Sequence, residues 1–127
     1  MEILTLREID ALIQKHIFGG EVTTYNEYIT DAKRIPNTLI YLTEGGFNYI
    51  PRYSEDIKDA WKVVEKFFRV DIETGNSRTE HFVILRTETG LTRSVYAKTA
   101  PLAICLAALK TQGIEVQIDA NEIGNDI

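Results

Sequence analysis

Apolar residues recur at helical spacing in three segments of the chain. In the first segment they lie mostly three or four residues apart between Ile9 and Ile17. Just before them, Thr5 and Glu8 have the spacing of a capping box, in which each side chain accepts a hydrogen bond from the other residue's backbone amide. This pattern predicts a helix over about residues 6–17, ended by the two glycines that follow.

The second segment begins after Pro51 with Ser54, a residue type that favours the N-cap of a helix. Glu55, Asp56 and Asp59 add negative charge in the first turns, where the helix dipole favours it. One apolar stripe then runs down the predicted helix and comprises Ile57, Ala60, Trp61, Val64, Phe67 and Phe68. We therefore expect the second helix to extend across this whole stripe.

The third segment is apolar on nearly all sides. Thr99 or Ala100 is placed to cap it, Pro101 is tolerated in its first turn, and Gly113 ends it. A helix with no polar face must be buried on most of its surface, so we expect it at the centre of the fold. Cys105 lies within this pattern and is interpreted as a small buried hydrophobic residue rather than a reactive thiol.

Between the first two helices the pattern changes to one typical of strands. Residues 38–42 are rich in β-prone side chains, and residues 47–50 alternate between apolar and polar positions. The glycines at 45 and 46 separate them, which predicts a short hairpin. Residues 21–33 mix helical spacing with turn-forming side chains, and their structure is left undecided. Near the end of the chain, the pattern of residues 114–118 predicts a final strand. We expect the polar tail that follows it to be frayed.

A second hairpin is predicted from residues 80–87 and 91–98, which flank a turn with Gly90 in a left-handed conformation. If Thr87 lies opposite Leu91, the alternation of strands fixes the rest of the register. One face then carries the pairs Phe82 with Tyr96, Ile84 with Ser94, and Arg86 with Thr92, and the other face carries Val83, Leu85 and Val95.

Composition and charge narrow the possible functions. The chain has 127 residues, enough for one domain, and its 44% hydrophobic and 26% charged residues are typical of globular proteins. A net charge of -5 disfavours a protein that binds nucleic acid mainly through phosphate neutralisation. No apolar run reaches the roughly 20 residues needed to cross a bilayer, and no secretory signal is evident. We expect a cytosolic protein without membrane or strong nucleic-acid binding.

The sequence offers little catalytic chemistry. Its double glycines lack the spacing and the lysine of a phosphate-binding loop. His16 and His81 have no second histidine or cysteine at the spacing of a metal site, and no serine stands in a nucleophile elbow. We therefore predict no enzyme activity, no metal and no cofactor.

Three segments in this order, Arg7–Ile13, Pro51–Lys66 and Thr99–Leu109, resemble the phage ABA-sandwich domain family. The resemblance implies an α+β fold, a compact sandwich of about three helices packed on an antiparallel β-sheet, encoded by phages and prophages. Residues 1–127 would form a single domain in the cytoplasm of the bacterial host. The segment at about 21–49 is longer than the connection that the resemblance implies, so we expect it to be an insertion.

A more distant resemblance is to the phage proteins that block Thoeris defence by trapping a cyclic ADP-ribose signal. These proteins share a compact plan of helices and a hairpin with the predicted elements. The resemblance suggests a kind of activity and carries over no residue.

Arginines and tyrosines form the best candidate site. Arginine presents a planar fork to phosphate oxygens, and an aromatic ring offers a surface on which a base stacks. The candidate ligand-binding residues are Arg52, Tyr53, Arg86, Arg93, Tyr96 and Lys98. Among them, Arg52, Arg86 and Arg93 are assigned to phosphates and the two tyrosines to stacking. The alternatives are that the aromatic residues belong to the core and the charged residues to an ordinary surface.

The leading hypothesis is a non-catalytic phage protein that sequesters a nucleotide-derived, cyclic immune signal and forms a homo-oligomer. The alternative is a phage inhibitor that binds a host defence protein, such as a nuclease or CRISPR effector, because tyrosine and arginine are also common anchors of protein interfaces. A third possibility is an enzyme that degrades the signal. Turnover would distinguish this last class from stoichiometric capture.

Overall fold

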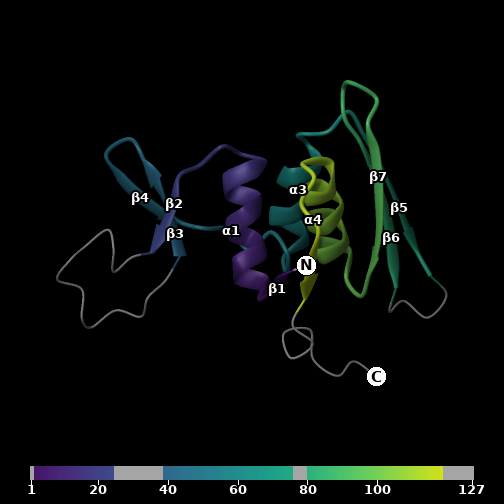
Figure 1. Cartoon of the computed structure of the whole chain (residues 1–127), viewed down its shortest axis with the longest axis horizontal. Coiled ribbons are helices and arrows are strands. Elements are labelled where there is room, and N and C mark those ends of the chain that lie inside the picture. Colours follow the sequence, from purple (N-terminus) through teal and green to yellow (C-terminus); the bar gives the residue numbers. More distant parts are fainter. Residues whose placement is uncertain (1, 25–38, 76–79, 119–127) are drawn as a thin grey trace.

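Three helices form the middle of the molecule and separate a small sheet from a larger one (Figure 1). The computed structural model describes residues 2–24, 39–75 and 80–118. Within these residues the helices are α1 (Leu6–His16), α3 (Ile57–Val64) and α4 (Ala100–Thr111). The α+β sandwich predicted from the family resemblance is confirmed.

The larger sheet is antiparallel and has the strand order β5 (Arg69–Thr74), β6 (His81–Arg86), β7 (Thr92–Ala97). The predicted register is confirmed, because Phe82 lies opposite Tyr96 and Arg86 lies opposite Thr92. Val83 and Leu85 are fully buried on the face that packs against α4. We call this the inner face of the sheet.

Strand β5 was not predicted, because the sequence pattern extended the second helix through Phe68. In the structure α3 ends at Val64, and the next residues form a tight turn in which the Lys66 amide donates to the Val63 carbonyl at 3.0 Å. The Phe68 amide then donates to the Arg86 carbonyl at 2.9 Å, which starts β5 beside β6. The prediction was wrong here because adjacent apolar residues fit both a helical stripe and a strand entry.

The predicted start of this helix also needs correction. Asp56, not Ser54, is the N-cap of α3, and its side chain accepts from the Lys58 amide at 2.8 Å. Ser54 is instead buried against α1, where its hydroxyl donates to the Leu6 carbonyl at 3.2 Å. A residue with good capping chemistry is thus used for tertiary contact.

Further along α3, Trp61 and Ile57 are about half exposed, so the predicted apolar stripe belongs only partly to the core.

The small sheet contains β2 (Val22–Thr24), β3 (Leu39–Thr43) and β4 (Gly46–Tyr49). The predicted β3–β4 hairpin is confirmed, with Gly45 at its turn in the left-handed region at a φ of 95°. Strand β2 lies within residues 21–33, whose structure the sequence left undecided, and residues 25–33 of that segment lie outside the described residues. That residues 21–49 are an insertion in a single domain stays a prediction.

The two ends of the described chain form a third, parallel pair between β1 (Glu2–Leu4) and β8 (Val116–Ile118). The final strand was predicted, but β1 was not, because its sequence Glu-Ile-Leu does not alternate between polar and apolar residues as Val116–Ile118 does. The polar tail expected to be frayed falls outside the described residues.

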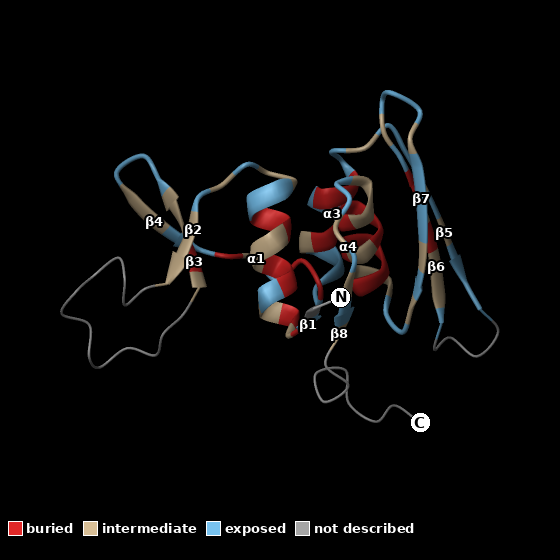
Figure 2. Ribbon diagram, viewed as in Figure 1, coloured by how far each residue is buried: buried red, intermediate tan, exposed pale blue. Residues whose placement is uncertain are grey.

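The core lies between the helices and the inner face of the large sheet, as the buried residues in Figure 2 show. The predicted capping box of α1 is present, and α4 runs from its Thr99 cap through an almost wholly buried apolar segment. Cys105 is fully buried there, and desolvation raises the pKa of its thiol well above the usual value. The thiol therefore stays neutral and packs as a hydrophobic residue.

Candidate functional site

The large sheet has a second face, turned away from α4, which we call the outer face. Figure 1 shows the described helices on the inner side of this sheet alone. Side chains alternate along a strand, so the registers of the three strands determine which residues share the outer face. These are Arg69, Asp71, Glu73, Phe82, Ile84, Arg86, Thr92, Ser94 and Tyr96.

One end of the outer face is aromatic. The rings of Phe82 and Tyr96 have their centroids 4.4 Å apart and are tilted by 33°. Tyr96, the last residue but one of β7, is 65% exposed. A shallow hollow of about 210 Å³ adjoins the pair and is also lined by Glu73 and Glu80. This end offers a flat apolar surface next to carboxylate acceptors.

The opposite end of the outer face carries two arginines. Arg69 on β5 lies directly opposite Arg86 on β6, and both are exposed. Together with Ile84 and Thr92 they line a hollow of about 150 Å³. Asp71 offsets part of this charge, because its carboxylate lies 3.3 Å from Arg69 Nε. Arg86 is four positions after Phe82 on β6, so the two ends lie about 13 Å apart.

The structure brings only two of the six predicted site residues onto this face. Arg86 and Tyr96 share the outer face, whereas Arg93 lies opposite Leu85 and belongs to the inner face at the edge of the sheet. Lys98 follows the end of β7. Arg52 and Tyr53 lie in the loop before α3, where Tyr53 contacts Gln14 on α1. Arg69 was missed because its strand was missed.

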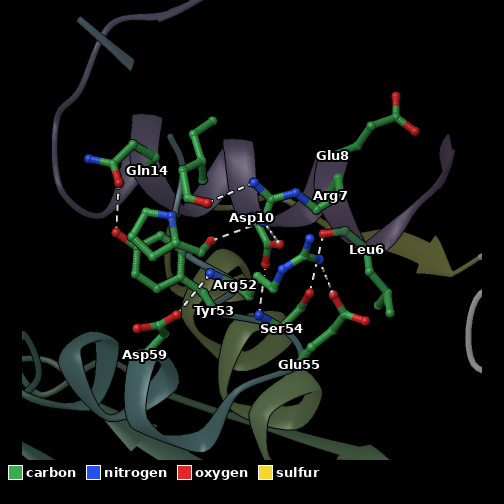
Figure 3. A network of polar contacts seen from close by, with 12 residues as sticks. Leu6, Arg7, Glu8, Asp10, Gln14, Arg52, Tyr53, Ser54, Glu55 and Asp59 are labelled. Carbon is green, nitrogen blue, oxygen red and sulfur yellow. Dashed lines mark hydrogen bonds and ion pairs between the residues drawn. The ribbon is translucent and has the colours of Figure 1, made fainter. Parts of the chain in front are cut away.

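The surroundings of Tyr53 exclude it from stacking on a ligand. It is 3% exposed, and its hydroxyl donates to Gln14 Oε1 on α1 at 2.6 Å. Its ring stacks on Phe18 with centroids 5.1 Å apart, and desolvation raises the pKa of its hydroxyl. Arg52 beside it is exposed, but it pairs with Glu55 at 3.0 Å (Figure 3).

The same loop is held to α1 by a buried carboxylate. Asp10 is fully buried and accepts from the Ser54 amide and from Arg7 Nη1, each at 2.7 Å. Arg7 also donates to the Ile50 carbonyl at 2.7 Å. Burial raises the pKa of Asp10 in spite of these contacts, which act in the opposite direction. Among the described residues every buried side-chain polar atom has a partner, so this network fixes structure and leaves no group for a ligand.

The described residues contain no group of three or more histidine, cysteine, aspartate or glutamate side chains that could hold a metal ion. None of their helices is long and apolar enough to cross a membrane.

Comparison with known proteins identifies the fold family. The family described as the phage ABA sandwich domain matches residues 11–109. The chain belongs to the phage ABA-sandwich domain family. This assignment covers each of the three described helices in whole or in part and the whole of the large sheet as described.

A solved structure supports the family assignment. The 2.0 Å crystal structure of a phage protein from Bacillus cereus ATCC 14579 is 32% identical in sequence and superimposes with a TM-score of 0.70. The match covers 92% of this chain and 95% of the other. No curated protein matches the chain. The chain is thus a phage protein with an ABA-sandwich domain.

Proposed function

We propose that this ABA-sandwich protein is a non-catalytic phage counter-defence protein that binds and sequesters a nucleotide-derived, cyclic immune signal of the bacterial host. The outer face of the large sheet is the binding surface. One observation carries the proposal: an aromatic pair, in which Tyr96 is exposed and Phe82 is partly buried, and an exposed arginine pair lie on the same uncovered face of the described sheet.

The two ends of the face suit the two ends of a nucleotide. A base stacks on Tyr96 and Phe82, an interaction worth about 1–3 kcal/mol per base. Phosphate oxygens accept hydrogen bonds from Arg69 and Arg86, which are charge-assisted and stronger than neutral ones. A separation of about 13 Å favours a ligand with more than one nucleotide unit, since it spans both ends of the face.

The acidic residues in the two hollows determine which end of the ligand binds in each hollow. Glu73 and Glu80 line the aromatic hollow and repel phosphate there, while their carboxylates can accept from exocyclic amines of a base. At the other end, the two positive charges of Arg69 and Arg86 exceed the one negative charge of Asp71. The base is therefore placed on β6 near Phe82 and the phosphates near Arg86.

Capture without turnover is the mode of action that this surface supports. The candidate residues bind through stacking and charge, and the cysteine of the chain is a buried, neutral thiol that cannot serve as a nucleophile. Sequestration lowers the concentration of a signal in proportion to the protein present. That the protein is a homo-oligomer remains a prediction.

The second candidate function is inhibition of a host defence protein by direct contact. It is favoured by Trp61 and Ile57, which lie four residues apart on α3 and are 48% and 51% exposed. Tryptophan is the residue type most enriched in interface hot spots. This surface is separate from the outer sheet face and can be tested by its own substitution, Trp61→Ala.

Native mass spectrometry tests the leading proposal. The protein is purified from bacteria in which a nucleotide-signalling defence is active, and its mass is recorded before and after heat release of small molecules. An intact nucleotide at fixed stoichiometry supports sequestration and gives the oligomeric state. Release of cleaved products would indicate an enzyme, and an empty protein that retains a host protein would favour the second candidate.

Variants locate the site once binding is measured. Arg69→Ala combined with Arg86→Ala should lose the retained nucleotide, and so should Tyr96→Ala. Arg52→Ala is the matched control, because it removes an exposed arginine that lies away from the outer face. Loss in the control alone would move the site to the loop before α3.

A further inference from the structure

Strand β7 is an edge of the large sheet, and within the described residues it pairs with β6 alone. In an antiparallel pair, residues alternate between those that exchange backbone hydrogen bonds with the partner strand and those whose amide and carbonyl point away from it. The Thr87 amide donates to the Leu91 carbonyl at 2.9 Å, which fixes the phase of this alternation.

In this phase the β7 residues that exchange backbone hydrogen bonds with β6 are Arg93, Val95 and Ala97. The backbone amides and carbonyls that point away from β6, toward the open edge, belong to Thr92, Ser94 and Tyr96. Two side-chain contacts agree with this phase. Lys110 Nζ donates to the Ser94 carbonyl at 3.4 Å, and Arg93 Nη1 donates to the Thr92 carbonyl at 2.8 Å. The edge therefore presents a row of backbone donors and acceptors, two of which are held by cationic side chains.

A hollow lies beside this edge on its inner side. Its volume is about 240 Å³, and its apolar lining comes from Val95, Leu106, Ile114 and Val116. Tyr96, Lys110 and Glu115 also line it. Its size is suited to one aliphatic side chain, and it lies where alternate side chains of an added strand would point.

The charge of the β7 edge indicates which kind of added strand would bind there. Residues 92–98 contain two cations and no acid, and Lys110 from α4 adds a third cation at the same edge, against one acid, Glu115, in the lining of the hollow. This local excess stands against a net charge of -5 for the whole chain. A second copy of β7 would bring the same cations to this edge and be repelled, because like charges on neighbouring strands are unfavourable.

We propose that the β7 edge is a docking site for an extended acidic peptide of a partner protein, which adds a strand to the sheet and places one aliphatic side chain in the hollow. Acidic side chains of the peptide draw Arg93 and Lys110 away from the carbonyls that they hold. Those carbonyls and the edge amides then bond to the peptide backbone. The inference is independent of nucleotide binding on the outer face.

Nuclear magnetic resonance with a synthetic probe tests this site. The probe is a short peptide that alternates isoleucine with glutamate, and its control carries lysine in place of each glutamate. The glutamate peptide should bind at least tenfold more tightly. It should also slow hydrogen exchange at the amides of Thr92, Ser94 and Tyr96.

Charge reversal supplies the variant test. Arg93→Glu combined with Lys110→Glu should invert the preference between the two peptides, whereas Lys58→Glu combined with Lys62→Glu on α3 should leave it unchanged. Equal binding of both peptides, no binding of either, or protection of other amides would overturn the proposal. Protection of the same three amides by self-association without peptide would also overturn it and assign the edge to a second copy.

Discussion

Two arginine–tyrosine pairs in this protein have opposite environments. In the loop before α3, Tyr53 is 3% exposed and bonded to Gln14, whereas on the large sheet Tyr96 is 65% exposed, with its ring tilted against that of Phe82. Arg52 pairs with Glu55, and Arg86 lies on an open face beside Arg69. The first pair is part of how the chain folds, and the second is available to bind.

The comparison shows that residue type alone does not define a binding site. Both pairs have the chemistry to stack on a base and bind a phosphate, but hydrogen-bonding capacity already satisfied within the protein is not free for a ligand. The loop and the sheet should therefore respond differently to substitution. Changes in the loop network should lower stability, and changes on the outer face should lower binding.

The largest effect is expected from Asp10→Ala. The substitution leaves the Ser54 amide and Arg7 without the carboxylate that both contact at 2.7 Å. Loss of such a buried, charged acceptor should reduce the free energy of unfolding by about 3 kcal/mol. Urea denaturation followed by circular dichroism measures it, and a loss as small as that of an exposed substitution would contradict the structural role of the loop.

Removal of the outer-face arginines should give the next largest effect. Arg69→Ala with Arg86→Ala should weaken binding of the recovered nucleotide by about 100-fold, since each deletes charge-assisted hydrogen bonds. The thermal midpoint should change little because both side chains are exposed. Calorimetric titration measures binding, and unchanged affinity would remove the outer face as the phosphate site.

The two tyrosines can be compared directly by removing each hydroxyl. Tyr53→Phe leaves Gln14 Oε1 without the bond of 2.6 Å and should cost about 1–1.5 kcal/mol of stability. Tyr96→Phe should change stability by less than about 0.5 kcal/mol because that residue is exposed. It should also retain binding, because the ring that stacks is kept. Equal losses of stability in the two variants would contradict the difference between a buried, hydrogen-bonded Tyr53 hydroxyl and an exposed Tyr96.

The smallest effect concerns pH. Burial raises the pKa of Asp10 in the folded protein above the usual value of 3.8, so the folded state binds its proton at higher pH than the unfolded state does. The contribution of this group to stability is full below the unfolded pKa and is lost as pH rises through the folded pKa. Relative to Asp10→Asn, the wild-type protein should thus gain stability as pH falls from neutral toward 4. A relative loss over this range would mean that the ion pair with Arg7 outweighs burial.

Much of the fold could be predicted because its elements carry strong local patterns. The capping box at Thr5, the apolar α4 and the register around Gly90 depend on residues close together in the sequence. Strand β5 was missed because the apolar residues before it also continue a helical stripe, and β1 was missed because its residues do not alternate between polar and apolar types. Both strands are defined by their partners more than by their own pattern.

The candidate site was harder to predict than the fold. The predicted register placed Arg86 and Tyr96 on one face, but Arg93 was grouped with Arg86 as a phosphate ligand although the same alternation assigns it to the opposite face. The alternating charges of Arg69, Asp71 and Glu73 were the signal that could have revealed β5 and its arginine. No local pattern indicated that Tyr53 is buried, because its partners Gln14 and Phe18 lie more than thirty residues away.

The most direct test compares Arg86→Ala with Arg93→Ala in calorimetric titrations with the nucleotide recovered from the native protein. The two arginines lie on the same hairpin and differ in the face of the sheet to which they belong. Binding should weaken at least tenfold for Arg86→Ala and stay within about twofold of wild type for Arg93→Ala. The reverse result, or equal losses, would contradict the assignment of nucleotide binding to the outer face.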